Sequence, residues 1–243
     1  MLNNTNLLDE LACAGKMPVA ERFVSINGEG AAAGQLAAFI RFAGCNLNCS
    51  YCDTAWANTE NAVETAKAYT VDELVQWIKA ASVCCVTLTG GEPVLQPLLP
   101  NLVKRLASEI GANLRIEIET NGSVDLKPLC VLRDTLDANI TFTVDWKLGS
   151  SGEEGRMSRQ NFALLDGRDA VKFVCGTKED LQEMLSVVEQ LALKDRVNIF
   201  LSTVFGKFEP AEIVEFMKAN NINWARIQLQ MHKIIWPNKI KGV

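Results

Sequence analysis

Histidine is almost absent from this sequence: His232 is the only one among 243 residues. Serine–histidine–aspartate triads and histidine-rich metal sites are therefore nearly excluded, because both depend on imidazole side chains. Any chemistry that the protein performs must come from other side chains or from a bound cofactor.

Membrane-length apolar runs and a basic charge excess are also missing. No stretch approaches the length of about 20 apolar residues that crosses a bilayer, and the net charge of −5 gives no global basic footprint for nucleic acid. The N-terminal segment carries Asp9 and Glu10 in place of a basic start and an apolar stretch, so it is not typical of a signal peptide. We therefore expect a cytoplasmic protein with no direct nucleic-acid partner and no membrane partner.

What the chain does have is the composition of a globular protein. It is 48% hydrophobic and 22% charged, which suits a protein that buries a sizeable core. We find no repeat and no convincing interdomain linker, so the sequence predicts one domain over residues 1–243, with residues 1–17 as an N-terminal extension of unknown role. The segment Gly149–Arg156 is rich in glycine, serine and charge, and we interpret it as a mobile loop inside this domain.

Strand-like and helix-like segments alternate along the chain. Strands are predicted at residues 36–42, 83–89, 114–119, 140–146, 170–175, 197–203 and 225–230, and helices at residues 70–81, 98–110, 177–193 and 209–221. This alternation indicates an α/β fold with a mostly parallel sheet and crossover helices. About six or seven strands are too few for a closed eight-stranded barrel, so we predict an open, partial β/α barrel. A doubly wound sheet is the alternative.

Four distinctive motifs each follow one of the first four predicted strands. A cysteine-rich loop follows residues 36–42, and the sequences TGGEP, ETNG and DWK end the next three strands. In parallel sheets and barrels, the loops at the carboxyl ends of the strands build the active site. We therefore expect the four motifs to meet on one rim of the fold.

Three cysteines occupy the first of these loops with the spacing Cys-x3-Cys-x2-Cys, at Cys45, Cys49 and Cys52. None of the other five cysteines has ligand-like spacing. A four-iron cluster held by three thiolates leaves one iron open to a small molecule. A zinc site needs a fourth ligand, which His232 or a distant cysteine could supply, so zinc stays an alternative on chemistry alone.

The cysteine spacing, the aromatic Tyr51 before the last cysteine and GGEP at Gly90–Pro93 together resemble the signature of the radical S-adenosylmethionine (SAM) superfamily. Without the cysteine loop, GGEP would be an ordinary turn at the end of a strand. The resemblance implies that the three cysteines hold a [4Fe-4S] cluster and that SAM binds its open iron.

A narrower resemblance extends from about Pro18 to the C-terminus. The segments Ser25–Gly30, Phe39–Thr54 and Gln228–Val243 are similar to the 7-carboxy-7-deazaguanine synthases, the lyases of the queuosine pathway called QueE. Asn27 replaces the usual glutamine of that family. The resemblance implies conversion of 6-carboxy-5,6,7,8-tetrahydropterin to 7-carboxy-7-deazaguanine, by hydrogen abstraction with a 5′-deoxyadenosyl radical, ring contraction and loss of ammonia.

Cofactor contacts follow from the same resemblance. The residues implied to line SAM are Tyr51, Cys52, Asp53, Gly90, Gly91, Glu92, Asn121, Asp145, Trp146 and Lys147. Many relatives have Ser-Pro-Lys at the last three positions. Thr54 is implied to bind Mg²⁺, with water and substrate as the remaining oxygen ligands. Read alone, Asn121 would be a left-handed turn residue and Thr54 a loop hydrogen-bonding residue.

The pterin substrate is implied to contact Ile26, Asn27, Gly28, Glu29, Arg41, Thr89, His232 and the terminal carboxylate of Val243. Glu29 suits the N–H donors of the pterin as an acceptor, and Arg41 can donate two parallel hydrogen bonds to a carboxylate. A buried ion pair is the structural alternative for Arg41, with Glu29 as one candidate partner, because an unpaired charge in an apolar strand is costly. His232 could equally be a structural residue.

The implied partners are a one-electron donor of the flavodoxin or ferredoxin type and a second copy of the chain in a homodimer. Two other functions stay open. A glycyl-radical activase would share the cysteine spacing but lacks NGEG before the first predicted strand and the KGV ending. A zinc-stabilised binding module would not be an enzyme at all.

Overall fold

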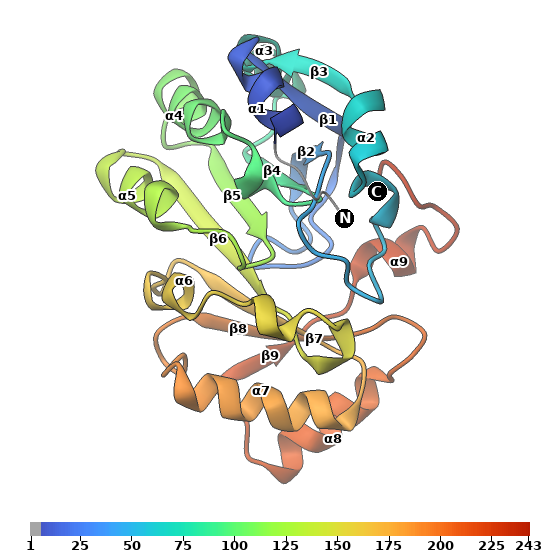
Figure 1. Cartoon of the computed structure of the whole chain (residues 1–243). Coiled ribbons are helices and arrows are strands. Elements are labelled where there is room, and N and C mark those ends of the chain that lie inside the picture. Colours follow the sequence, from blue (N-terminus) through green and yellow to red (C-terminus); the bar gives the residue numbers. More distant parts are fainter. Residues whose placement is uncertain (1–5) are drawn as a thin grey trace.

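We analysed a computed structural model that describes residues 6–243, in which nine strands form one sheet with the order β3-β1-β2-β4-β5-β6-β7-β8-β9 (Figure 1). The strands are β1 (Lys16–Ile26), β2 (Leu36–Phe42), β3 (Lys67–Thr70), β4 (Cys85–Gly90), β5 (Arg115–Thr120), β6 (Asn139–Trp146), β7 (Ala170–Cys175), β8 (Asn198–Thr203) and β9 (Ala225–Ile227). From β2 to β9 all neighbours are parallel, and the sheet ends at β3 and β9 without closing. The predicted partial barrel is confirmed.

Two strands were not expected. β1 pairs antiparallel with β2 and with the short edge strand β3, so both lie outside the parallel part of the sheet. The pattern of β1 is hard to recognise, because Glu21 and Arg22 interrupt its apolar residues and Pro18 lies near its start. The N-terminal extension proposed for residues 1–17 contains α1 (Asn6–Cys13) and the beginning of β1, and its first five residues lie outside the described part.

Helices cover the outer, convex face of the curved sheet (Figure 1). They are α2 (Glu60–Thr65), α3 (Val71–Ala81), α4 (Leu99–Ile110), α5 (Lys127–Thr135), α6 (Arg159–Ala163), α7 (Lys178–Gln190), α8 (Pro210–Ala219) and α9 (Met231–Ile235), of which α2 and α9 lie to the side of this face. A capping box begins α3: Glu73 N donates to Thr70 Oγ1 (3.2 Å) and Thr70 N donates to Glu73 Oε2 (2.8 Å). The described helices include none that is long and apolar enough to cross a membrane.

The core lies between the helices and the outer face of the sheet, while the inner face is unusually polar. In β5, Ile116 and Ile118 are buried in the core, whereas Glu117 and Glu119 alternate with them and point inward. Oε1 of Glu117 accepts a hydrogen bond from Thr143 of β6 (2.8 Å). The concave side of the sheet is therefore lined by charge and hydroxyl groups, which suits a ligand cavity more than a packed core.

The loop between β1 and β2 spans the open side of the barrel. Gly30 N donates to Gln228 Oε1 (2.7 Å), and Gln228 Nε2 donates back to Gly30 O (2.9 Å). Gly30 has φ of +77°, and a Cβ there would lie 2.8 Å from Glu117 Oε1, so only glycine fits without strain. This double hydrogen bond joins the first loop of the sheet to the segment that follows its last strand.

The segment Gly149–Arg156 is more structured than the mobile loop that the sequence predicts. It forms two short 3-10 helices, Gly149–Ser151 and Glu154–Arg156. It also docks onto the cysteine loop: Ser50 N donates to Ser151 O (3.0 Å), and Asn48 N donates to Glu153 Oε1 (2.7 Å). Composition alone did not reveal these contacts, because their partners lie about a hundred positions away in the chain.

Candidate active site

A cavity of about 300 Å³ opens on the concave side of the sheet, at the carboxyl ends of the parallel strands. All four sequence motifs contribute to its lining, so the expectation that they meet on one rim is confirmed. Of the residues implied by the family resemblance, all line this cavity except Asn27, Glu92 and Trp146.

Backbone hydrogen bonds hold the cysteine loop against the GGEP motif. Gly91 N donates to Phe42 O (3.0 Å) and Glu92 N donates to Gly44 O (2.8 Å). A Cβ on Gly90 would collide with the backbone of Phe42, and one on Gly91 with the carbonyl of Gly44. Both glycines are therefore required for the close approach of two backbones, a reason independent of the predicted approach to SAM.

Three thiols face this cavity, and they are free cysteines. Cys45 Sγ accepts from Leu47 N (3.4 Å) and lies 3.6 Å from the amide of Asn121, while Asn58 Nδ2 donates to Cys52 Sγ (3.3 Å). Amide donors around the sulfurs suit thiolates that hold an iron–sulfur cluster. The three thiols and these donors therefore fit the cluster that the resemblance implies.

The same geometry does not suit a single zinc ion. Within residues 6–243, no three His, Cys, Asp or Glu side chains converge as ligands of one metal ion must. A cluster has a looser requirement, because each thiolate binds a different iron atom. The arrangement of the thiols thus favours a cluster over the zinc alternative.

Glu92 lies behind the cavity wall. It is fully buried and accepts hydrogen bonds from Thr120 Oγ1 (2.7 Å), Asn121 N (2.7 Å) and Val94 N (2.9 Å). Burial raises the pKa of its carboxyl to about 7, against the opposing effect of these donors. Glu92 fastens the GGEP motif to the loop after β5, so its position suits support of the site and not direct cofactor contact.

Asn121 lines the cavity, and its alternative interpretation as a left-handed turn residue is wrong. The positive φ in this turn belongs to Gly122 (+74°). The Asn121 side chain instead forms hydrogen bonds within the protein: its Nδ2 donates to Asn46 Oδ1 (3.1 Å), and its Oδ1 accepts from Ser123 Oγ (2.7 Å).

Like Glu92, Trp146 and Asn27 do not line the cavity. Strand alternation sends Asp145 and Lys147 inward and Trp146 outward, where its ring packs against Phe162 at a centroid distance of 4.9 Å. The Asn27 side chain is buried below the cavity and accepts a hydrogen bond from Thr87 Oγ1 (2.8 Å). Side-chain contacts of these two residues with SAM or substrate, as the resemblance implied, would need a different conformation.

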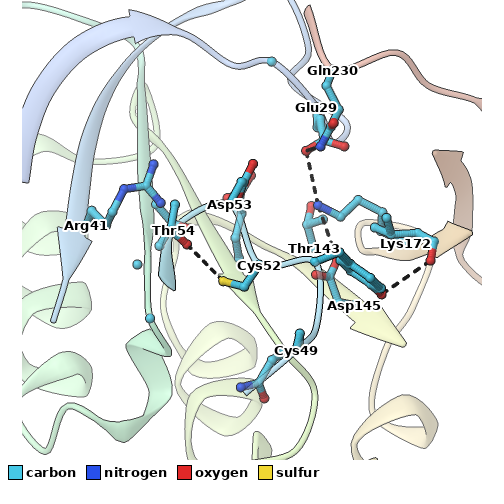
Figure 2. Close-up of a pocket in the computed structure, with 18 of the residues that line it drawn as sticks. Glu29, Arg41, Cys49, Cys52, Asp53, Thr54, Thr143, Asp145, Lys172 and Gln230 are labelled. Carbon is cyan, nitrogen blue, oxygen red and sulfur yellow. Dashed lines mark hydrogen bonds and ion pairs between the residues drawn. The ribbon is translucent and has the colours of Figure 1, made fainter. Parts of the chain in front are cut away.

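Charged side chains form the opposite part of the lining. Lys172 Nζ lies 3.5 Å from Glu29 Oε2 and 3.4 Å from Asp145 Oδ1, so one ammonium bridges two carboxylates (Figure 2). Asp145 also pairs with Lys147 Nζ (2.6 Å). Although burial favours the neutral amine, these carboxylates hold the pKa of Lys172 well above its ordinary value. The cluster of charges is therefore internally balanced.

Glu29 has two further neutral donors, Ser202 Oγ (3.2 Å) and Gln230 Nε2 (3.4 Å). Arg41 does form an ion pair, as its structural alternative predicts, but Glu29 is not its partner. Arg41 Nε donates instead to Glu21 Oε1 (2.8 Å), its direct neighbour across the antiparallel pair of β1 and β2. That strand was not predicted, which is why its carboxylate was not considered.

His232 and Thr54 are both among the residues that line the cavity. A Cβ on Gly28 would collide with the His232 imidazole, so the two residues are in close contact. Burial lowers the pKa of His232, while the carboxylates of Glu29 and Asp53 oppose this effect. The Thr54 hydroxyl lies 3.6 Å from Cys52 Sγ. Val243 is another of the lining residues.

Sequence reasoning missed several lining residues, among them Asn58, Glu119, Lys172, Phe205, Gln230 and Lys233. Two of them carried a signal. Lys172 is the only charged residue of β7, and Glu119 lies in β5, where charged residues alternate with buried isoleucines; such placements are costly unless the charge is paired or used. The others lie in loops or in a short helix and have no distinctive pattern.

Comparison with known proteins is consistent with this site. The model of the radical SAM superfamily matches residues 39–145, which contain the cysteine loop and the GGEP motif. The chain is 46% identical over 226 residues to the 7-carboxy-7-deazaguanine synthase of Clostridium acetobutylicum, covering 93% of this chain and 98% of that protein. It is 37% identical over 220 residues to the enzyme of the same name from Methanospirillum hungatei, covering 90% and 85%.

A solved structure shares the fold. The crystal structure of QueE from Escherichia coli superposes with a TM-score of 0.67, at 22% sequence identity and with 93% of this chain and 98% of that chain covered. The open arrangement of mostly parallel strands is therefore found in an experimental structure as well.

Proposed function

The chain belongs to the family of 7-carboxy-7-deazaguanine synthases within the radical SAM superfamily, and from this premise we propose that it converts 6-carboxy-5,6,7,8-tetrahydropterin to 7-carboxy-7-deazaguanine. The reaction contracts a ring with loss of ammonia, and its product serves queuosine biosynthesis. One observation supports this most strongly: the three-cysteine loop and the charged cluster around Glu29 share a single cavity.

Cys45, Cys49 and Cys52 would hold the [4Fe-4S] cluster, with SAM at its open iron. When bound, this pair supplies one-electron cleavage of SAM and a 5′-deoxyadenosyl radical that abstracts hydrogen from the substrate. The chain contributes position and shelter: the cysteine loop is fixed by backbone hydrogen bonds to the GGEP motif, and Cys45 is buried. Tyr51, Asp53 and Asn121 border the same space.

Substrate recognition would use the charged part of the lining. The Glu29 carboxylate, which pairs with Lys172 Nζ at 3.5 Å, can only accept hydrogen bonds, and this suits the N–H donors of a pterin edge. Arg41 bonds to Glu21 through Nε, so its terminal N–H groups suit the substrate carboxylate. Thr54 would offer one oxygen to Mg²⁺, with the substrate and water completing the octahedral shell.

Anaerobic turnover tests the proposal directly. Reconstituted protein with SAM, a one-electron reductant and the carboxytetrahydropterin should form 7-carboxy-7-deazaguanine, detected by mass spectrometry. A protein that cleaves SAM only when a partner polypeptide is added would be a glycyl-radical activase instead. A colourless protein with about one zinc per chain, the content of a single four-ligand site, would make it a binding module.

Three further properties stay predictions, the first from the sequence alone and the other two from the resemblance. They are a cytoplasmic location, a homodimer, and an electron donor of the flavodoxin or ferredoxin type. Sedimentation of the purified protein tests the second, and reduction of the cluster by purified flavodoxin tests the third.

A further inference from the structure

Asn58 lies six positions beyond the last cysteine of the motif and has no assigned role. It ends the 3-10 helix Ala55–Ala57, where its backbone N–H donates to Ala55 O (3.2 Å). The residue is only 7% exposed, and it borders the cavity. An amide in this position must be explained, because burying polar groups is costly unless they are hydrogen-bonded.

Two bonds connect Asn58 to the cysteine ligands. Its side-chain Nδ2 donates to Cys52 Sγ (3.3 Å), and its backbone oxygen accepts from Cys45 N (3.2 Å). The Oδ1 atom of the same amide has no hydrogen-bond partner among the described residues. The amide is thus held by its backbone and by the sulfur alone, so the contact with Cys52 is its main polar interaction.

The three sulfurs differ in their surroundings. Cys45 has two N–H groups nearby and Cys52 has Asn58 and the Thr54 hydroxyl, whereas no such donor reaches Cys49 within residues 6–243. Hydrogen bonds to ligand sulfurs are among the factors that set the potential of an iron–sulfur cluster. Reduction adds negative charge to the cluster and its sulfurs, so a donor stabilises the reduced state more than the oxidised one.

We propose that Asn58 is a positioning residue that raises the reduction potential of the cluster by donating a hydrogen bond to the sulfur of Cys52. The inference rests on the proposed function, because it requires the [4Fe-4S] cluster. It assigns to Asn58 no contact with SAM or substrate. The prediction is that removing the donor makes the cluster harder to reduce at unchanged iron content.

The test is a redox titration of reconstituted protein, followed by the electron paramagnetic resonance signal of the reduced cluster. Asn58→Leu keeps the size of the side chain and removes the donor. At a fixed solution potential, the ratio of reduced to oxidised cluster should fall about five- to tenfold, as expected for one modest hydrogen bond lost from the reduced state. Asn58→His, whose Nδ1–H lies as many bonds from the backbone as the amide, should restore part of the ratio.

Asn48→Leu is the matched control. Asn48 is exposed, precedes Cys49, and is joined to its surroundings through its backbone N–H, so this variant should titrate like the wild type. If Asn58→Leu does not retain iron, Asn58→Val, a smaller uncharged side chain without a donor, takes its place and should shift in the same direction. A wild-type ratio in a variant with full iron content overturns the inference and leaves the proposed function intact. Wild-type protein that takes up no cluster overturns the proposed function itself.

Discussion

Two parts of the cavity are built in different ways. The cofactor wall, formed by the cavity-lining residues of the cysteine loop with Asn58, Gly90, Gly91 and Asn121, is held by backbone bonds and neutral amide donors. The substrate wall, formed by Glu29, Glu119, Asp145 and Lys172, is held by charges that balance one another. The residues of the first wall come mostly from one loop, while those of the second come from four separate segments.

This difference fits the two tasks proposed for the cavity. A wall around a cluster needs donors that stabilise sulfur without adding charge that would compete for the metal. A wall that recognises an anionic pterin needs ionised groups held in fixed positions, and buried charges keep their ionised form only when they are paired. Each wall can therefore be disturbed separately, which gives four tests.

The cofactor wall should depend entirely on its ligands. Cys49→Ala removes one of three thiolates, so we expect loss of the cluster and of all SAM cleavage. Iron and sulfide content and the formation of 5′-deoxyadenosine measure the two effects. Cys84→Ala, at an exposed cysteine outside the motif, should behave like the wild type. Retained cleavage by Cys49→Ala would refute the ligand assignment.

The substrate wall should depend on its central cation. Lys172→Met leaves Glu29 and Asp145 facing each other without their shared ammonium. Breaking such a pair costs about 2–3 kcal/mol in a partly open site, so kcat/KM for the pterin should fall roughly 30- to 150-fold. Iron content should not change, which separates the two walls. Lys172→Arg retains the charge and should recover part of the activity; an unaltered kcat/KM in Lys172→Met would contradict the bridging role.

The substrate wall should also respond to pH. Burial raises the pKa of the Glu119 carboxyl from 4.5 to about 7, with Lys172 opposing. The folded protein then retains a proton that the unfolded chain releases, so its stability falls as pH rises through this window and levels off above it. As the pH rises from 4.5 to about 7, the free energy of unfolding of the wild type should fall by about 1–2 kcal/mol relative to that of Glu119→Gln. This is less than the full pKa shift implies, because the carboxyl group borders the cavity and is partly screened by solvent. Urea unfolding at several pH values measures this difference, and parallel curves would show that Glu119 does not titrate there.

A weaker effect is expected where the segment Gly149–Arg156 supports the cofactor wall from outside. Glu153→Ala removes the acceptor of Asn48 N, a bond near the surface. Loss of about 0.5 kcal/mol should roughly double the rate at which a chelator strips the cluster, followed by absorbance. Glu154→Ala is the control, since no hydrogen bond joins that residue to the cysteine loop in the described structure. Equal rates in both variants would mean that this docking contact does not protect the cluster.

The fold could be predicted where the pattern was local. The short, mostly apolar runs 36–42 and 170–175 matched β2 and β7 to the residue, and the capping box of Thr70 and Glu73 lies at the start of α3. β1 and β3 were missed, because their stability comes from antiparallel pairing across the sheet and not from their own apolar pattern.

The same division applies to the site. The cofactor wall lies in motifs whose spacing is visible in the sequence, so most of its lining residues were predicted. Leu47 and Asn58 were missed, and Glu92 was predicted although it lies behind the wall. The substrate wall depends on Lys172 and Glu119, whose partners are brought together only by the sheet order. Whether Trp146 faces in or out depended on the strand register, which the motif alone does not specify.

The bond between Gly30 and Gln228 has a consequence for the order in which the enzyme is assembled. A chain growing on the ribosome has exposed its whole cysteine loop and the GGEP motif long before Gln228 is synthesised. The loop that carries Glu29 gains its anchor, and Glu29 gains Ser202 and Gln230, only when the last part of the chain emerges. The cysteine loop and the GGEP motif are therefore synthesised well before the contacts that fix Glu29 in the charged part of the cavity.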